Sequence, residues 1–149
     1  MSVDTWARLV PCDENYIPSP EAQTQAVDYF WNQIEACDEV VAEVYDTLTF
    51  VDADINDFSF CPHCEEGLDF EFWMEWYEVA EAEHFKAAPR ILPCCGQSAQ
   101  FRDLDYDFDQ GFGHFCLEAM VFEFPLDPKH IAEFERILGC PLRVIYRQI

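Results

Sequence analysis

The chain has 149 residues, with 30 Asp and Glu against 8 Lys and Arg, which gives a formal net charge of -22. Half of its residues are hydrophobic and 16% are aromatic, so it has the apolar material for a core that disordered acidic chains lack. The charge argues against DNA, RNA and anionic membrane surfaces as partners, because each of them carries negative charge itself.

Hydrophobic periodicity predicts alternating strands and helices along the chain. In chain order these are a strand at 6–10, a helix at 20–36, a strand at 40–51, an acidic loop at 52–57, a helix at 70–85, short strands at 90–92 and 99–104, a strand at 114–124, a helix at 127–138 and a strand at 142–149. Ser19 before Pro20, and Asp127 before Pro128, are typical of helix N-termini, and Gly139 is typical of a helix end.

The order of elements predicts an α+β fold. Without the cysteine-containing segment, the chain reads strand, helix, strand and then strand, helix, strand, which suits a ferredoxin-like split βαβ sandwich. We therefore expect a single α+β domain over residues 1–149, in which residues 59–104 form a zinc-ribbon-like insertion between the two halves.

Four of the eight cysteines lie in two short motifs that predict a metal site. Cys61 and Cys64 are separated by two residues, a spacing that lets both sulfurs reach one tetrahedral ion, and Cys94 and Cys95 precede a glycine in the second motif. Four thiolates make a closed structural zinc site. An insertion of about 45 residues is small enough to need a bound metal for its stability. We expect Zn2+ bound by Cys61, Cys64, Cys94 and Cys95.

The adjacent pair leaves alternatives open, because zinc ligands are usually spaced by two residues. His63 or His84 could replace one thiolate, or the cysteines could be ordinary buried thiols or a redox pair. A thioredoxin-like role is disfavoured, because Cys64 is followed by Glu65 and Glu66 rather than by a helix that would stabilise a thiolate.

The remaining cysteines and histidines predict no catalytic residue. Cys37, Cys116 and Cys140 sit on or beside apolar faces and read as small buried hydrophobes, while Cys12 is uninformative. Neither His114 nor His130 has a nucleophile or carboxylate at a recognisable spacing.

Two further segments have more than one interpretation. The alternation of acidic and apolar residues from 103 to 109 is read as a strand or a loop rather than as a calcium site, since it lacks the EF-hand glycine and glutamate. On the helix at 70–85, Trp73 and Tyr77 are predicted core residues, whereas Trp76 lies nearer the edge of that face and is a candidate exposed anchor for a partner.

The cysteine motifs also carry a family resemblance. The pattern Cys-Pro-His-Cys at 61–64, Leu-Pro-Cys-Cys-Gly at 92–96, Asp-Leu-Asp-Tyr at 103–106 and Gly-Phe at 111–112, with Phe115 and then Leu-Glu at 117–118, resembles a family of small, acidic, uncharacterised bacterial proteins. The resemblance implies the metal site and a bacterial origin, and supplies no reaction. Some proteins with this kind of motif pattern resemble immunity proteins of toxin systems.

The distribution of charge predicts a binding function. Residues 1–85 hold 21 acidic residues and one base, a net of -20, whereas the remaining residues are nearly neutral. We expect a non-catalytic protein whose acidic surface meets a basic protein partner, as an immunity protein or inhibitor would. The alternatives are a zinc-dependent enzyme, an assembly module of a larger complex, and acidity that serves only solubility, for example in a high-salt cell.

The sequence also predicts a location. The N-terminus has no basic stretch followed by an apolar run, and no window is long and apolar enough for a membrane span, so we expect a cytoplasmic protein with reduced thiols.

Overall fold

The computed structural model describes residues 4–34, 37–52, 59–86, 88–106, 110–122 and 124–148. The chain divides into two compact units, which are described separately below. The sheet unit comprises Met1–Ala53 and Gly111–Ile149, and the cysteine unit comprises Asp54–Gln110. The cysteine unit contains the whole stretch predicted as an insertion, 59–104.

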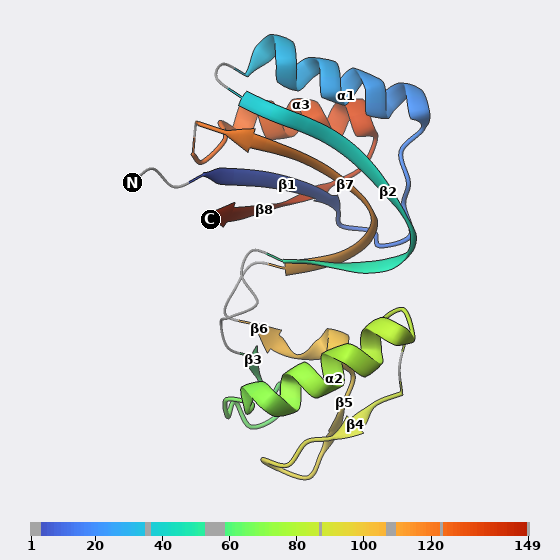
Figure 1. Ribbon diagram of the computed structural model, residues 1–149, viewed down its shortest axis with the longest axis vertical. Coiled ribbons are helices and arrows are strands. Elements are labelled where there is room, and N and C mark those ends of the chain that lie inside the picture. Colours follow the sequence, from blue (N-terminus) through green and yellow to red (C-terminus); the bar gives the residue numbers. More distant parts are fainter. Residues whose placement is uncertain are drawn as a thin grey trace. The chain divides into compact units, whose positions relative to one another are not determined.

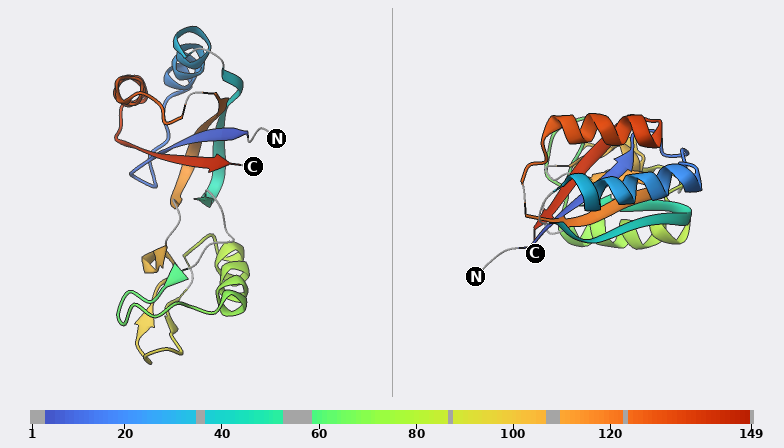
Figure 2. Two further views of the ribbon diagram at one scale, coloured as in Figure 1. Left: turned by 90° about the vertical axis from the view of Figure 1, so that its left-hand side faces the viewer. Right: turned by 90° about the horizontal axis from the view of Figure 1, so that it is seen from above.

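The sheet unit is an antiparallel four-stranded sheet with two helices on one face (Figures 1 and 2). The strand order is β2-β7-β1-β8. The elements are β1 (Thr5–Pro11), α1 (Pro20–Gln33), β2 (Cys37–Asp52), β7 (Gln110–Val121), α3 (Pro128–Leu138) and β8 (Leu142–Gln148). All six confirm elements predicted from the sequence, and the α+β class is confirmed with them.

The helix ends follow from local chemistry. The Ser19 side chain accepts a hydrogen bond from the backbone N–H of Ala22 at 3.2 Å, which satisfies a donor that would otherwise lack a partner at the start of α1. Asp127 does the same for Lys129 in α3. Gly139 ends α3 in the left-handed region, with φ 81°, and a Cβ there would also lie 2.9 Å from the Tyr16 hydroxyl.

The core of the sheet unit lies between the sheet and its two helices. The register pairs Ala7 of β1 with Ala119 of β7, and these small residues leave room for the aromatic side chains of the helices. Phe30 of α1 and Phe134 of α3 are fully buried, with ring centroids 4.5 Å apart. Helix α1 ends at Gln33, three residues before the predicted end at residue 36, and residues 35 and 36 lie outside the described part of the chain.

The cysteine unit is built from one α-helix, a short 3-10 helix and two small two-stranded sheets (Figure 1). Its elements are β3 (Ser59–Phe60), α2 (Phe70–Ala82), β4 (Arg90–Ile91), β5 (Ser98–Ala99), a 3-10 helix η1 (Phe101–Asp103) and β6 (Asp105–Tyr106). Strand β3 pairs with β6, and β4 pairs with β5. The predicted strand at 99–104 is therefore wrong beyond Ala99, because η1 takes its place.

Helix α2 packs against an aromatic cluster. Trp73 lies 5.5 Å from the Phe101 ring and 6.3 Å from the Tyr106 ring, measured between centroids, and Trp76 lies 5.5 Å from Phe101. Trp76 is 0% exposed, so its interpretation as an exposed anchor is wrong. The buried face of α2 is wider than the stripe through Trp73 and Tyr77, because Phe101 packs against both tryptophans.

Candidate metal centre

The first cysteine motif forms a tight turn directly after β3. The carbonyl of Cys61 accepts a hydrogen bond from the N–H of Glu65 at 3.0 Å, and the N–H of Cys61 donates to the carbonyl of Glu66 at 2.9 Å. Glu65 adopts a left-handed conformation with φ 65°. The turn places Cys61 and Cys64 on the same side of the loop, as a pair of metal ligands requires.

The second motif connects β4 to β5 through the same kind of turn. The carbonyl of Leu92 accepts from the N–H of Gly96 at 2.9 Å, and the N–H of Leu92 donates to the carbonyl of Gln97 at 2.9 Å. Gly96 has φ 75°, a conformation that glycine adopts without steric cost. In both turns, therefore, the first residue is hydrogen-bonded to the fifth residue and to the sixth.

Aligning the two turns explains the unusual adjacent cysteines. The fourth position is a cysteine in both, Cys64 in the first and Cys95 in the second. The first position is Cys61 in one turn and Leu92 in the other, and both side chains are 0% exposed. Leucine cannot bind a metal, and the fourth sulfur comes instead from Cys94, at the third position of the second turn.

The four sulfurs lie close enough together to hold one metal ion. The Sγ atoms of Cys61, Cys64, Cys94 and Cys95 all lie within 4.8 Å of one another, and those of Cys61 and Cys95 are 3.7 Å apart. With Zn–S bonds of about 2.3 Å, tetrahedral geometry places pairs of sulfurs about 3.8 Å apart. The four thiols are therefore compatible with one bound metal ion.

The backbone prepares Cys61 to act as a thiolate. Burial raises the pKa of this thiol, but hydrogen bonds to its sulfur lower the pKa to about 6. They come from the backbone N–H groups of Cys64 and His63, at 3.4 and 3.3 Å, and from the neighbouring thiols of Cys64 and Cys94. Burial and the neighbouring thiols raise the pKa of Cys94 to about 12. A bound cation would favour the thiolate form of every ligand.

The geometry disfavours histidine as a ligand. His63 Nε2 lies 2.9 Å from the backbone carbonyl oxygen of Ser98, so this nitrogen is used as a donor to the backbone. His84 is exposed just beyond the end of α2. Among the residues that the structure describes, the group able to hold a metal at this place contains four cysteines and no histidine.

The scattered cysteines are separate from this centre. Cys116 and Cys140 are buried and Cys37 is half-buried, as expected for small apolar side chains. Burial raises the pKa of Cys116 to about 12 and that of Cys140 to about 11, so both remain unreactive thiols at neutral pH. Cys12 is exposed.

These environments predict the number of reactive thiols. With zinc bound, one thiol, that of Cys12, is expected to react rapidly with a colorimetric thiol reagent, because metal ligands and buried thiols are shielded. Chelation should raise the number to about five by releasing the four ligands. Five rapid thiols in protein supplied with excess zinc would contradict a metal centre, and the fully denatured chain, with all eight cysteines accessible, calibrates the count.

The two histidines of the sheet unit have structural partners. His130 is buried and its Nδ1 lies 2.8 Å from the Tyr29 hydroxyl, while the Nδ1 of His114 lies 3.1 Å from the carbonyl oxygen of Tyr45. These contacts connect each histidine to a neighbouring element of the sheet unit.

The acidic segment at 103–109 is partly described. Leu104 is buried and Asp103 and Asp105 are exposed, which supports alternation of buried and solvated side chains over the first residues. Tyr106 donates a hydrogen bond to the carbonyl oxygen of Phe101 at 2.9 Å. Residues 107–109 lie outside the described residues.

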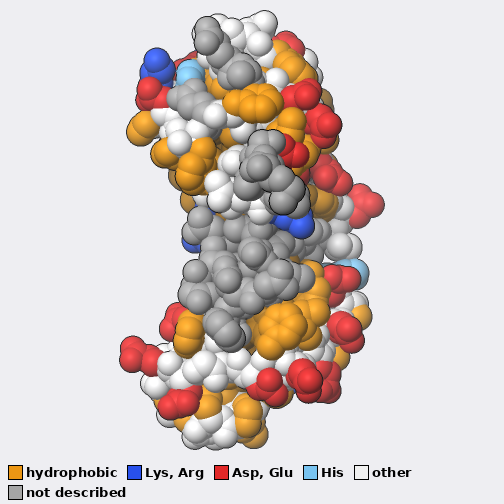
Figure 3. All heavy atoms as spheres, turned by 60° about the vertical axis from the view of Figure 1, so that its left-hand side comes forward, with side chains coloured by type: hydrophobic (Ala, Val, Ile, Leu, Met, Phe, Trp, Pro, Cys, Tyr) orange, Lys and Arg blue, Asp and Glu red, His pale blue; other side chains and the backbone are white. Residues whose placement is uncertain are grey.

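The cysteine unit carries an acidic surface on α2. Glu71, Glu75 and Glu78 are exposed and share one helical stripe, opposite the buried Trp73 and Trp76. Every acidic residue in the described part of this unit is exposed. Figure 3 shows one face of the molecule, with many acidic side chains in red and few basic ones in blue.

Comparisons with protein-family models, with curated proteins and with solved structures found no match. In the part of the chain that the structure describes, no helix is long and apolar enough to cross a membrane. The assignment of function therefore depends on the four sulfurs and on the surface around them.

Proposed function

We propose that the chain is a non-catalytic binding protein whose cysteine unit is held together by a structural zinc ion. The observation that carries this proposal is the close approach of four sulfurs, which come from two turns of the same geometry. Four thiolates fill the coordination of zinc and leave no position for water or substrate, which favours a structural role over a zinc-dependent enzyme.

We infer that the acidic surface of the cysteine unit binds a basic protein partner. Residues 54–110 contain 14 acidic residues and three bases in the sequence. The aromatic cluster fixes α2, so the stripe of Glu71, Glu75 and Glu78 faces away from the core as a preformed surface. A one-signed surface accelerates encounter with a partner of opposite charge and rejects others, as an immunity protein or inhibitor requires.

A pair of variants with equal net charge tests this surface. Replacing Glu71, Glu75 and Glu78 by Gln changes the formal charge from -22 to -19, as does the control Glu21→Gln, Asp28→Asn and Asp38→Asn on the sheet unit. We expect the immobilised wild-type chain to capture a discrete basic protein from source extract in a salt-sensitive manner. The α2 variant should lose most of this capture, and the control variant should keep it.

The outcomes separate three explanations. Equal retention by both variants would remove α2 from the interface, and equal loss would mean that net charge alone attracts the protein. Capture that resists moderate salt would contradict an electrostatic interface, because screening weakens exposed charge pairs.

We further propose that the sheet unit has the ferredoxin-like split βαβ topology. Its support is the strand order β2-β7-β1-β8 together with two strand-helix-strand units, β1-α1-β2 and β7-α3-β8, whose helices share one face. A cytoplasmic location and a bacterial origin complete the proposal. Their support is the number of free cysteines and the motif resemblance, since thiols and thiolate-bound zinc persist in a reducing compartment.

A further inference from the structure

Strand β2 forms one edge of the sheet unit (Figures 1 and 2). In the order β2-β7-β1-β8 it has β7 on one side, and no described strand pairs with its other side. Alternate backbone N–H and C=O groups of an edge strand point away from its sheet and are open to another chain. The strand is 16 residues long, and Val41 and Val44 are 50% and 46% exposed. A long edge with exposed apolar side chains is a template for an added strand.

An open groove lies between this edge and helix α1. Its volume is about 320 Å³, and its lining residues are Pro20, Gln23, Thr24, Val27 and Ala42. Val27 of α1 and Ala42 of β2 are half-buried and pack against the core of the sheet unit. Alanine has no side chain beyond Cβ, so β2 leaves this part of α1 uncovered. A strand added to β2 would place a side chain about 5 Å from Ala42, where it would fill the groove.

The charges along the edge favour a basic chain. Glu43 and Asp46 of β2 are exposed and form no ion pair with any described residue. The sequence contains no Lys or Arg between residues 9 and 85. A second copy of β2 would bring acids against acids, which is destabilising across paired strands, whereas Lys or Arg at those positions is stabilising.

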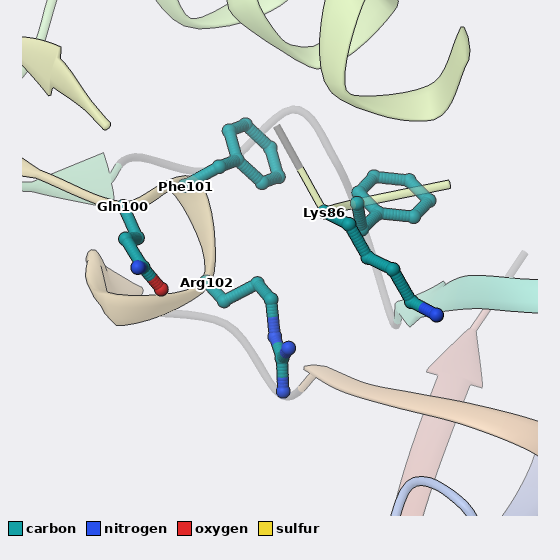
Figure 4. A pocket seen from close by; sticks show the side chains of 5 residues that line it. Lys86, Gln100, Phe101 and Arg102 are labelled. Atoms are coloured by element: carbon teal, nitrogen blue, oxygen red, sulfur yellow. The ribbon is translucent and has the colours of Figure 1, made fainter. Parts of the chain in front are cut away.

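The cavity in the cysteine unit does not offer a comparable site (Figure 4). It is lined by Phe85, Lys86, Gln100, Phe101 and Arg102. The polar ends of Lys86 and Gln100 point away from each other, so these side chains do not converge on one ligand. We assign no ligand to this cavity.

We propose that β2 binds an extended basic peptide segment by strand addition. Main-chain hydrogen bonds to the edge provide affinity, and alternate side chains provide specificity. Successive side chains of a strand point to opposite faces, so the apolar side chains of the peptide enter the groove beside Ala42 while its Lys or Arg side chains lie near Glu43. The site is separate from the acidic stripe of α2 and does not depend on a partner binding there. Glu43 and Asp46 also remain in the charge-matched control variant of the sheet unit, so that control leaves this site intact.

An alternating lysine–valine octapeptide is the probe that tests strand addition. The zinc-supplied full chain is titrated with this peptide, and exchange of backbone amide protons is followed by NMR. We expect saturable binding with slowed exchange at every second amide between Val41 and Thr47, because only alternate N–H groups of a strand face its open edge. Uniform protection, or none, would overturn the proposal.

Two methylated versions of the peptide separate strand addition from simple charge attraction. One is methylated at the backbone nitrogens of its lysines and the other at those of its valines, so their charges are equal. Only one of these two sets of nitrogens faces β2 in an added strand. We expect one version to bind roughly tenfold more weakly than the parent peptide and the other to bind about as well. Equal affinity of the two versions would contradict main-chain pairing.

A charge-matched pair of variants locates the peptide on the edge. Glu43→Gln with Asp46→Asn changes the formal charge from -22 to -20, as does Glu71→Gln with Glu75→Gln on α2. We expect the β2 variant to weaken the peptide about threefold to tenfold, and the α2 variant to weaken it less than about twofold. The same loss in both variants would mean that net charge alone attracts the peptide. The α2 pair also keeps this test independent of the partner proposed for that stripe.

Filling the groove tests the apolar contact. Thr24→Trp places a large side chain in the groove and should weaken the peptide about fivefold or more. Gln25→Trp makes the same addition at the next exposed residue of α1, which does not line this groove, and should leave the affinity nearly unchanged. Equal affinities in these two variants would remove the groove from the site. Unchanged amide signals of Phe30 and Phe134 show that each variant is folded.

Discussion

Chelation of zinc is expected to unfold the cysteine unit and to leave the sheet unit folded. Structural zinc contributes about 10–16 kcal/mol at neutral pH in small zinc-stabilised units. A unit of this size rarely obtains more than about 3–5 kcal/mol from its core. The sheet unit has a separate core around Phe30 and Phe134. Amide signals of Trp73 and Trp76 should collapse to unfolded positions in a chelator titration, while those of Leu117 and Ala119 persist.

Two buried cysteines provide the matched control for chelation. Cys61→Ser should reproduce the loss of the cysteine unit, because it removes the ligand that the backbone prepares as a thiolate. Cys116→Ser makes the same chemical change at a buried residue of the sheet unit and should retain one zinc per chain. If the Cys61 variant keeps its zinc and its tryptophan signals, the four-thiolate centre is wrong.

Moving a ligand within the second turn is expected to preserve the metal centre. Cys94→Ser alone should weaken zinc binding by roughly 100-fold or more, because one of four first-sphere ligands is lost. Leu92→Cys combined with Cys94→Ser should restore most of that affinity. Residue 92 has the same position in the second turn as Cys61 has in the first. We therefore expect a sulfur at residue 92 to point at the ion.

The control for this rescue is Leu92→Ala with Cys94→Ser, which removes the same bulk without adding a thiol. Affinity is measured by competition with a chromophoric chelator, and cobalt substituted for zinc reports the number of sulfur ligands by its charge-transfer absorption. If the cysteine and alanine versions bind equally weakly, the two turns are not equivalent around the metal.

The parts of the fold that the sequence predicts well depend on local chemistry. Ser19, Asp127 and Gly139 act within their own helix ends, and each is found at the end predicted from its residue type. The pairing of Cys61 with Cys64 is similarly local, because its spacing alone brings two sulfurs together.

The parts that the sequence misses depend on packing between distant residues. The strand expected at 99–104 gives way to η1, because Phe101 and Leu104 both turn into the buried interior of the cysteine unit. Trp76 is buried for the same reason, since Phe101 contacts it from 25 positions further along the chain. The equivalence of Leu92 and Cys61 becomes visible only through backbone hydrogen bonds.

The connection between β2 and β7 has a consequence for chain entropy. The two strands are neighbours in the sheet, so the cysteine unit occupies the place of a hairpin loop. The entropic cost of closing a loop grows only with the logarithm of its length, by about 0.6 kcal/mol for each doubling. A whole folded unit can therefore be carried at this hairpin with little loss in the stability of the sheet, and its surface can diverge while the sheet sequence stays under its own packing constraints.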